Sequence, residues 1–267
     1  MEREEYPVAC TIAGSDSGGG AGIQADLKTF TALGVWGCTV ITALTAQNPV
    51  EVRGSWTVPP GFVRLQLEAV QDEFSIRAYK TGMLGTAAVV HEVAESLPAS
   101  AVLVIDPVMV ATSGAPLLDA DGKKALIEEL LPASTLATPN IPEACAIAGM
   151  RSISTPLEMA RAADAIREMG AGAVLVKGGH LAGGESVDVL VDSEGTHYLE
   201  GVRYPFAVHG TGCCLSAAIT AYLARGLALR DACRDAKIFI DAAISSGPAS
   251  RSGRRMADPS AHAKRRW

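Results

Sequence analysis

Residues 209–214, His-Gly-Thr-Gly-Cys-Cys, directly precede an alanine-rich run that has the apolar spacing of a helix. Glycines before a helix leave its first backbone N–H groups free and let a ligand approach closely. The positive end of the helix dipole then attracts anions, phosphate above all. A thiol at that position is expected to have its pKa lowered toward that of a reactive thiolate. The same letters also fit a tight strand-to-helix turn around a buried small side chain, so both interpretations stand at this point.

Three charged residues elsewhere fit the transfer of a phosphoryl group. Lys177 and Asp106 each follow an apolar run, and Glu143 lies in the segment TPNIPEA. A lysine neutralises phosphate charge, and carboxylates hold a water-rich Mg²⁺ shell. Each residue alone also fits an ordinary surface charge. No GxxxxGK[ST] motif occurs, and GGGAG lacks the GxGxxG spacing, so the P-loop and dinucleotide signatures are absent.

Short apolar runs alternate with amphipathic runs, which predicts an α/β fold with a mostly parallel, doubly wound sheet and helices on both faces. The predicted strands are residues 8–13, 39–44, 78–80, 102–106, 135–138, 174–177 and 187–191. The predicted helices are residues 23–33, 62–72, 86–96, 123–131 and 157–169, then two helices after Thr211 that divide near 226–231. Ligands of such sheets bind beyond the carboxyl ends of the strands. Polar or glycine-rich segments occupy those ends at 14–22, 44–48, 80–84, 106–114, 138–144 and 176–180.

The chain has 267 residues, enough for one large α/β domain, and no linker or internal repeat divides the pattern. We therefore expect a single domain over residues 1–250. Residues 251–267 carry six basic side chains against one acid, which predicts a basic, disordered tail. The net charge is −6 in spite of that tail. The rest of the chain is therefore acidic, which argues against a nucleic-acid partner, because nucleic-acid phosphates require a basic surface.

The six cysteines form no CxxC pair and no spaced Cys/His set, which argues against a zinc site. The first residues, MEREEYP, are acidic and show no apolar signal stretch, and no run of 18 apolar residues occurs. These features predict a cytoplasmic protein with reduced thiols and no membrane partner.

Seven segments together resemble one family of enzymes. They are AGSDSGGGAGIQADLKTF, TALTAQN, KTGML, DPVMVA, TPNIPEA, VLVKGGH and HGTGCCLSAAI, and the resemblance as a whole runs from about residue 9 to about residue 246. In this order they resemble the ribokinase-like kinases, and among those the hydroxymethylpyrimidine/phosphomethylpyrimidine kinases of thiamine biosynthesis. The resemblance implies a three-layer ribokinase-like fold with a minimal lid. It also implies ATP- and Mg²⁺-dependent phosphorylation of 4-amino-5-hydroxymethyl-2-methylpyrimidine, and then of its monophosphate to the diphosphate.

The resemblance assigns the catalytic residues to the segment first described. Sugar kinases of the superfamily carry an aspartate base where this chain has Cys213, so Cys213 is the candidate base beside the substrate hydroxymethyl group. The backbone amides of Gly210, Thr211, Gly212 and Cys213 would form an anion hole for the transferred group. Thr211 and Lys177 would also contact the nucleotide, Lys177 at its phosphates.

The resemblance likewise implies a substrate pocket. Gln47 would pair with the aminopyrimidine edge, because an amide offers both a donor and an acceptor. Met83 and Val108 would sandwich the ring, although as sequence alone they fit core positions equally well. Gly14 and Asp26 would lie near the substrate, and Asp26 also fits a surface acid of the first helix.

The nucleotide end follows in the same way. Asn140 and Glu143 would join the magnesium–phosphate network, and Asp106 would lie close to the same charges, so Asp106 and Glu143 are the candidate metal ligands. Asp188 matches a family acid to which we assign no role. The family also implies a homodimer.

Two segments depart from the family pattern. Residues 204–208, YPFAV, stand where a threonine-asparagine pair is usual, which leaves the nucleotide contacts there open. Cys214 replaces the usual threonine, either as a neutral small residue or as one half of a vicinal disulfide with Cys213. His209 is expected to cap or orient the loop, and His180 is placed to approach the phosphates.

Two other functions remain open from the sequence. A pyridoxal or pyridoxine kinase is possible because some enzymes of this sequence type use that ring and share Gly-Thr-Gly-Cys. A non-catalytic pyrimidine-binding sensor is a more distant alternative, because such a protein need not keep Asp106, Glu143, Lys177 and Cys213.

Overall fold

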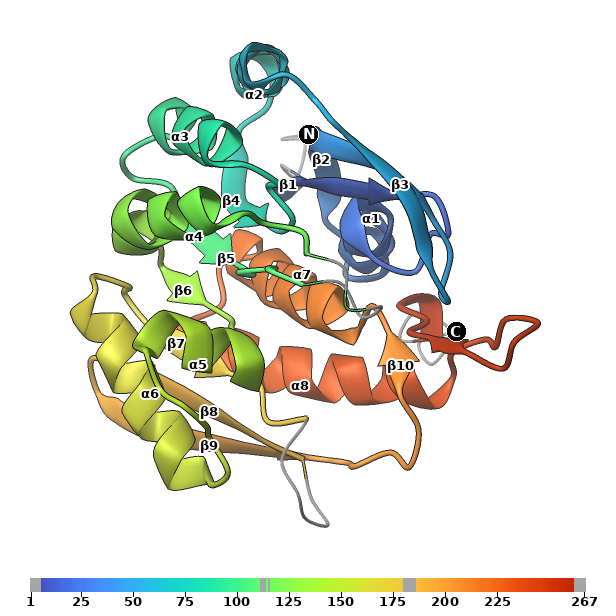
Figure 1. The fold of residues 1–267 in the computed structure, drawn as a ribbon, viewed down its shortest axis with the longest axis vertical. Coiled ribbons are helices and arrows are strands. Elements are labelled where there is room, and N and C mark those ends of the chain that lie inside the picture. The colour runs from blue at the N-terminus through green and yellow to red at the C-terminus, as the bar shows by residue number, and fades with distance from the viewer. Residues whose placement is uncertain (1–5, 111–113, 115, 180–185, 262–267) are drawn as a thin grey trace, which may run out of the picture.

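The computed structural model describes residues 6–110, 114, 116–179 and 186–261. Its central feature is a nine-stranded sheet (Figure 1). In spatial order its strands are β3 (Val52–Thr57), β2 (Trp36–Gln47), β1 (Val8–Asp16), β4 (Ile76–Thr81), β5 (Leu103–Ile105), β6 (Leu136–Ala137), β7 (Val174–Val176), β8 (Ser186–Asp192) and β9 (Gly195–Gly201).

The strands from β2 across to β7 are parallel, whereas β3, β8 and β9 each run antiparallel to the preceding neighbour in the chain. The strand order runs outward in opposite directions from the β1–β4 pair. This is a topological switch point, at which an α/β sheet leaves a crevice beyond its carboxyl edge. The predicted mostly parallel sheet is confirmed, and the switch point locates the site along that edge.

Helices cover both faces of the sheet. One face packs against α1 (Gly22–Ala32), α7 (Thr211–Ala224) and α8 (Leu229–Ser245), and the last two lie side by side in Figure 1. The other face carries α2 (Pro60–Glu73), α3 (Ala87–Ser96), α4 (Ala120–Ala125), α5 (Ile141–Ala148) and α6 (Pro156–Glu168). The helix α4 continues through a π-helical turn, Leu126–Leu130, and a 3₁₀ turn, Leu131–Ala133.

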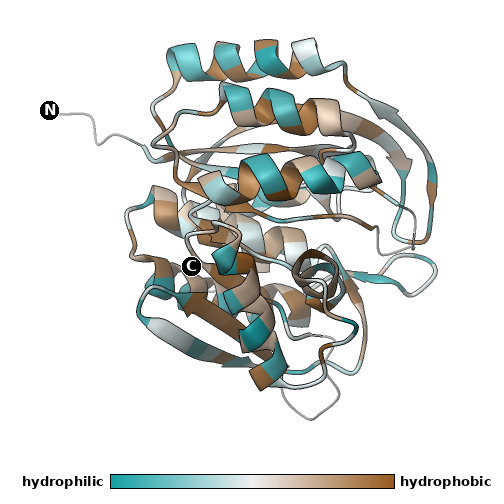
Figure 2. Cartoon of the chain, turned by 60° about the vertical axis from the view of Figure 1, so that its left-hand side comes forward, coloured by the Kyte–Doolittle hydropathy of each residue, from teal (hydrophilic) through white to brown (hydrophobic). Residues whose placement is uncertain are grey.

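Alternation along the strands explains both layers. In β5, Val104 faces the α1–α7–α8 layer, whereas Leu103 and Ile105 face the opposite layer. Successive strand residues point to opposite faces, so a run that is apolar throughout must be covered on both sides. Teal and brown residues alternate along the outer helices in Figure 2, as amphipathic helices require. No helix in the described part of the chain is long and apolar enough to cross a membrane.

Each predicted strand and helix has a counterpart, but the prediction missed several elements. The edge strands β3 and β9 were missed because they are largely exposed and contain glycine, so they lack a buried apolar run. The helix α5 was missed although its signals are present. Asn140 and Glu143 form a capping box, Pro142 lies in the first turn, and Gly149 ends the helix in the left-handed conformation.

The prediction of a disordered segment from residue 251 onward is wrong for its first part. Arg255–Met256 forms β11, which pairs with β10 (Val208–His209). The Ala257 N–H donates to the His209 carbonyl at 3.1 Å, and the Ala257 and Ala261 side chains are buried. Backbone pairing with β10 therefore fixes this segment despite its charge. Residues 262–267 lie outside the described residues, and the division into one domain and a tail remains a prediction.

Candidate active site

A cavity of about 620 Å³ lies at the carboxyl edge of the sheet. It is lined by the segments that follow β1, β2, β4, β5, β6 and β7 and by the start of α7. Twelve of the predicted site residues line this one cavity: Gly14, Gln47, Met83, Asp106, Val108, Asn140, Glu143, Lys177, Gly210, Thr211, Gly212 and Cys213. The exception is Asp26, which does not line it.

The start of α7 has the backbone geometry of an anion site. Gly210 precedes the helix with φ +83°, and no side chain caps the helix. A Cβ on Gly210 would lie 1.8 Å from the Gly20 carbonyl oxygen, so only glycine fits there. The amides of the first turn consequently remain available to a ligand that enters the cavity.

Asp16, which was not among the predicted site residues, organises the glycine-rich loop that faces α7. Its buried carboxylate accepts N–H bonds from Gly18, Gly20 and Ala21 at 2.8, 3.1 and 2.8 Å. His209 Nε2 lies 3.3 Å from the same carboxylate. Burial opposes ionisation of Asp16, but these bonds outweigh it and lower its pKa. The available signal was an aspartate followed by Ser-Gly-Gly, since aspartate commonly bonds to backbone N–H groups in turns.

Lys177 and Asp106 form a buried ion pair beside the anion site. Lys177 Nζ donates to Asp106 Oδ1 at 2.7 Å, and Ser216 Oγ donates to Asp106 Oδ2 at 3.1 Å. Burial opposes ionisation of Asp106, yet Lys177 and Lys80 keep its pKa below the usual range. A Cβ on Gly212 would lie 3.3 Å from Lys177 Nζ. The absence of a side chain at Gly212 thus lets the ammonium lie against the first turn of α7, where both attract phosphate.

Glu143 is held by its own helix start. Its side chain accepts from the Asn140 N–H at 2.8 Å, and the Glu143 N–H donates to the Asn140 side chain at 2.9 Å. Burial raises the pKa of Glu143 to about 7, and the negative charge of Asp106 adds to that rise against the opposing effect of Lys177. Two carboxylates and an amide suit Mg²⁺, which binds few protein oxygens and completes its shell with water and substrate phosphates. No group of three or more Cys, His, Asp or Glu in the described residues forms a metal site by itself.

A Glu143→Gln variant is expected to become more stable relative to wild type as the pH rises from about 4.5 to above 7. The native protein holds the Glu143 proton up to about pH 7, whereas the unfolded chain releases it near pH 4.5, the ordinary pKa of a glutamate. The free energy of unfolding of the wild type therefore falls by up to about 3 kcal/mol across this pH window. Glutamine does not titrate, so the variant does not share this loss. Urea unfolding of both proteins from pH 4.5 to 8 measures the difference. A constant difference across that range would contradict the raised pKa.

The expectation for the thiol of Cys213 is wrong in its direction. Burial raises the pKa of Cys213 to about 11, and the nearby Lys80 only partly offsets this. Cys214 is fully buried with a pKa raised to about 12, chiefly by burial. Both cysteines are free thiols, so Cys214 is a small core residue rather than half of a vicinal disulfide. The helix start alone does not make Cys213 a thiolate near neutral pH.

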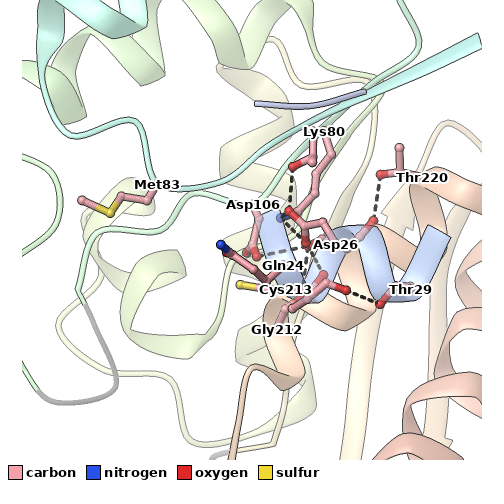
Figure 3. Close-up of polar contacts among 12 residues, drawn as sticks. Gln24, Asp26, Thr29, Lys80, Met83, Asp106, Gly212, Cys213 and Thr220 are labelled. Atoms are coloured by element: carbon pink, nitrogen blue, oxygen red, sulfur yellow. Dashed lines mark hydrogen bonds and ion pairs between the residues drawn. The ribbon is translucent and has the colours of Figure 1, made fainter. Parts of the chain in front are cut away.

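Asp26 lies beneath the cavity wall. Its side chain is fully buried and bonds to Lys80 Nζ at 2.7 and 2.9 Å and to Thr11 Oγ1 at 2.6 Å (Figure 3). This buried position agrees neither with direct contact between Asp26 and the substrate nor with an acid on the protein surface. The helix α1 carries Asp26 on its inward face, which a single acid in an amphipathic pattern does not reveal.

The ring end of the cavity has the predicted composition. Gln47 is half-buried at the end of β2, and its backbone bonds to the Ser17 hydroxyl in both directions, with N–H to Oγ at 2.8 Å and Oγ to O at 2.7 Å. Met83 and Val108 are partly buried in the cavity wall. A Cβ on Gly14 would lie 3.0 Å from the Met83 sulfur, so this glycine makes room for the methionine.

The opposite end of the cavity contains a third buried ion pair. Lys237 Nζ donates to Asp188 at 2.7 Å, and Asp188 also accepts the Gly178 N–H at 2.8 Å. Residues 204–208, the segment that departs from the family pattern, line the same end. Arg255 lies over the Phe206 ring at 4.3 Å, so the tail segment braces this wall. His180 falls outside the described residues.

Comparison with known proteins identifies the family to which this chain belongs. A family model described as phosphomethylpyrimidine kinase matches residues 16–258. A hydroxymethylpyrimidine/phosphomethylpyrimidine kinase from Rhizobium meliloti is 49% identical over 241 residues, which cover 90% of this chain and 91% of that protein. A phosphomethylpyrimidine kinase structure from Clostridium difficile is 43% identical with a TM-score of 0.77, covering 87% of this chain and 97% of that one.

A further solved structure is the pyridoxal kinase from Staphylococcus aureus in complex with AMP-PCP and pyridoxal. It is 34% identical with a TM-score of 0.89, and the match covers 96% of this chain and 94% of that one. The ribokinase-like expectation for the fold is therefore confirmed. Because the family model matches residues 16–258 and a relative is 49% identical over 90% of the chain, this chain belongs to the phosphomethylpyrimidine kinase family.

Proposed function

We propose that this enzyme transfers the γ-phosphoryl group of ATP to 4-amino-5-hydroxymethyl-2-methylpyrimidine and then to the monophosphate that results, as a step of thiamine biosynthesis. The observation that carries the proposal is the single cavity that joins a ring-binding end to a phosphate-binding end. Gln47, Met83 and Val108 line the former, and Lys177 and the α7 start line the latter. Family membership supports the phosphotransferase activity.

The phosphate end neutralises charge during transfer. Phosphoryl transfer passes through a loose transition state, so catalysis depends mainly on positioning and on charge neutralisation. The ammonium of Lys177 and the amides of Thr211, Gly212 and Cys213 meet the charge on the transferred group. Asp106 and Glu143, with Asn140, would hold Mg²⁺, which when bound shields the phosphate oxygens.

Cys213 takes the proton of the attacking hydroxyl. Its side chain lines the cavity at the first turn of α7, where the acceptor oxygen and the transferred group must meet. Because its pKa lies at about 11, the thiolate is a minor form at neutral pH. The high pKa also makes the thiolate that does form a strong proton acceptor. In the second reaction a phosphate oxygen of the monophosphate is the acceptor, and the same anion site receives the product.

A Gln47→Ala variant is expected to bind the pyrimidine about tenfold or more weakly while binding ATP normally. The change removes hydrogen bonds to the ring edge, each worth about 0.5–1.5 kcal/mol, and leaves the phosphate end intact. Isothermal titration with each ligand separately measures both affinities. An equal loss for pyrimidine and ATP would mean that the ring does not bind at Gln47.

A pyridoxal kinase is the second candidate, because the S. aureus protein with bound pyridoxal shares the fold closely. The pyridoxal and aminopyrimidine rings differ at the edge that Gln47 would face. Measuring the turnover of each compound therefore distinguishes the two candidate functions. ADP release is measured with ATP and Mg²⁺ and each of four acceptors: the hydroxymethylpyrimidine, its monophosphate, pyridoxal and ribose. We expect turnover of both pyrimidines. Turnover of pyridoxal alone would overturn the proposed substrate while leaving the kinase assignment intact, and binding without any turnover would favour the sensor.

We also propose a cytoplasmic homodimer. The exposed Leu44 and Trp56 are paired neighbours across β2 and β3, and an exposed apolar patch on a sheet can mark an interface. Sedimentation equilibrium is expected to give twice the mass of the chain, and Trp56→Ser is expected to weaken that association. A monomer at micromolar concentration would contradict the dimer.

A further inference from the structure

Lys80 and Asp26 form an ion pair that is entirely closed to solvent, and phosphoryl transfer as described above does not use it. Both side chains are 0% exposed. Lys80 Nζ donates to both carboxylate oxygens of Asp26, and Thr11 donates to one of them. The pair joins β4 to α1, as Figure 3 shows, and Lys80 but not Asp26 lines the cavity.

Stability alone does not account for this pair. Taking two charges out of water costs several kcal/mol each, and well-packed apolar residues in place of such a pair are often neutral or stabilising. The position of the pair provides the reason. Lys80 lines the cavity although it is inaccessible to solvent, and a Cβ on Gly82 would lie 3.3 Å from its Nζ. The ammonium therefore reaches the cavity floor because Gly82 has no side chain.

Lys80 and Cys213 both line the cavity, and Figure 3 shows them in the same cluster of side chains. Asp26 takes two of its three N–H donors, and the described residues offer no acceptor within hydrogen-bond distance for the third. The charges of Lys80 and Cys213 act on each other: Lys80 lowers the pKa of the thiol, and a thiolate raises that of the ammonium. In Figure 3, Lys80, Asp26, Asp106 and Cys213 converge from β4, α1, the end of β5 and α7.

Four charged groups thus surround the thiol. Lys177 is engaged by Asp106 at the phosphate end, and Lys80 is engaged by Asp26 at the floor. Asp26 and Asp106 both disfavour a thiolate, and burial disfavours it more strongly. Lys80 is the largest opposing influence. Without Lys80, burial and the two acids would all disfavour the thiolate of Cys213. Of the four charged groups, only Lys177 would then favour it.

We propose that Lys80 is a positioning residue for phosphoryl transfer: its ammonium, fixed by Asp26 at the cavity floor, supports the thiolate of Cys213. The inference rests on the proposed function. In the step it serves, the thiolate takes the proton of the substrate hydroxyl, and the oxygen forms a bond to the γ-phosphorus. The bond from that phosphorus to the bridging oxygen breaks, ADP leaves, and the thiol later returns its proton to water.

The test measures iodoacetamide alkylation of Cys213 at pH 8.5 without substrate, followed at this site by mass spectrometry. A pKa rise of one unit lowers the thiolate fraction tenfold and raises its nucleophilicity about threefold. Alkylation in Lys80→Met is therefore expected to slow about threefold or more. The kcat is expected to fall about tenfold or more with the KM for ATP unchanged.

A double variant protects the test against failure to fold. Asp26→Asn with Lys80→Met removes both buried charges, so no unpaired carboxylate remains. This double variant is expected to fold. Its Cys213 is expected to be alkylated more slowly than in wild type but faster than in Lys80→Met, because Asp26 disfavours the thiolate. The matched control is Asp188→Asn with Lys237→Met, which removes the buried pair at the far end of the same cavity and is expected to leave alkylation unchanged.

Alkylation of Cys213 at the wild-type rate in Lys80→Met and in the double variant would show that the pair is only structural. This result would overturn the inference. Equal slowing in the control pair would overturn it as well, because the effect would then be a general loss of packing. The alkylation assay contains no substrate. A failure of the proposed function, seen as absent pyrimidine turnover, is therefore distinguishable from a failure of this inference.

Discussion

A Cys213→Ala variant is expected to fold normally and to lose about 10²–10⁴-fold in kcat, the range that a positioned general base contributes. The thiol lines the cavity at the first turn of α7, and alanine keeps the helix while removing the proton acceptor. The KM for ATP is expected to change little, because the amides and Lys177 remain. Steady-state kinetics with the hydroxymethylpyrimidine measures the loss.

Two comparisons make this prediction specific. Cys214→Ala changes the neighbouring thiol, which is buried in the core, and is expected to lower stability without lowering kcat. In the wild type, the thiolate fraction rises with pH well below the pKa of about 11, so kcat is expected to rise from pH 7 to 9 by up to about tenfold per unit. A Cys213→Ala enzyme with undiminished kcat would show that positioning alone carries the reaction.

A Lys177→Met variant is expected to lose about 10³-fold or more in kcat/KM for ATP. An arginine that neutralises charge on a transferring phosphoryl group contributes about 10³–10⁵-fold in kcat, and Lys177 is expected to act in the same way. The change also leaves Asp106 buried without its partner, which costs about 3–5 kcal/mol of stability. Arginine at position 177 keeps the charge and is expected to restore part of the activity.

Folding and catalysis can be separated in this variant. Asp106→Asn combined with Lys177→Met removes the unpaired carboxylate and is expected to recover stability but not activity. Thermal unfolding and ATP titration are measured on the same samples. Recovery of full activity in the double variant would mean that Lys177 acts only as the partner of Asp106.

The edge of the sheet was predictable because strand order and strand ends follow from local patterns. Lys177 and Asp106 each end a short apolar run, so a parallel sheet must bring them to one edge. In the structure, Lys177 Nζ lies 2.7 Å from Asp106 Oδ1. Edge strands such as β3 carry no buried stripe and gave no comparable signal. The pairing of Arg255–Met256 with β10 depends on a neighbour 47 residues earlier in the chain, which no local pattern contains.

The charge states within the site were not predictable in the same way. A cysteine at a helix start suggests a lowered pKa, but burial outweighs that effect for Cys213. The sequence likewise shows an acid at Asp26 and a lysine at Lys80 without showing that they are buried against each other. Burial and long-range pairing determine these properties, and both arise only when the chain is folded.

The central claim is that one cavity phosphorylates the hydroxymethyl group and then the resulting monophosphate. The most direct test follows a single incubation of the hydroxymethylpyrimidine with excess ATP and Mg²⁺ by ³¹P NMR. We predict that a phosphate monoester appears first and is then replaced by a pyrimidine diphosphate, and that both signals are delayed in Cys213→Ala. If no pyrimidine ester forms while the same enzyme phosphorylates pyridoxal, the assignment of the ring-binding end to a pyrimidine is contradicted.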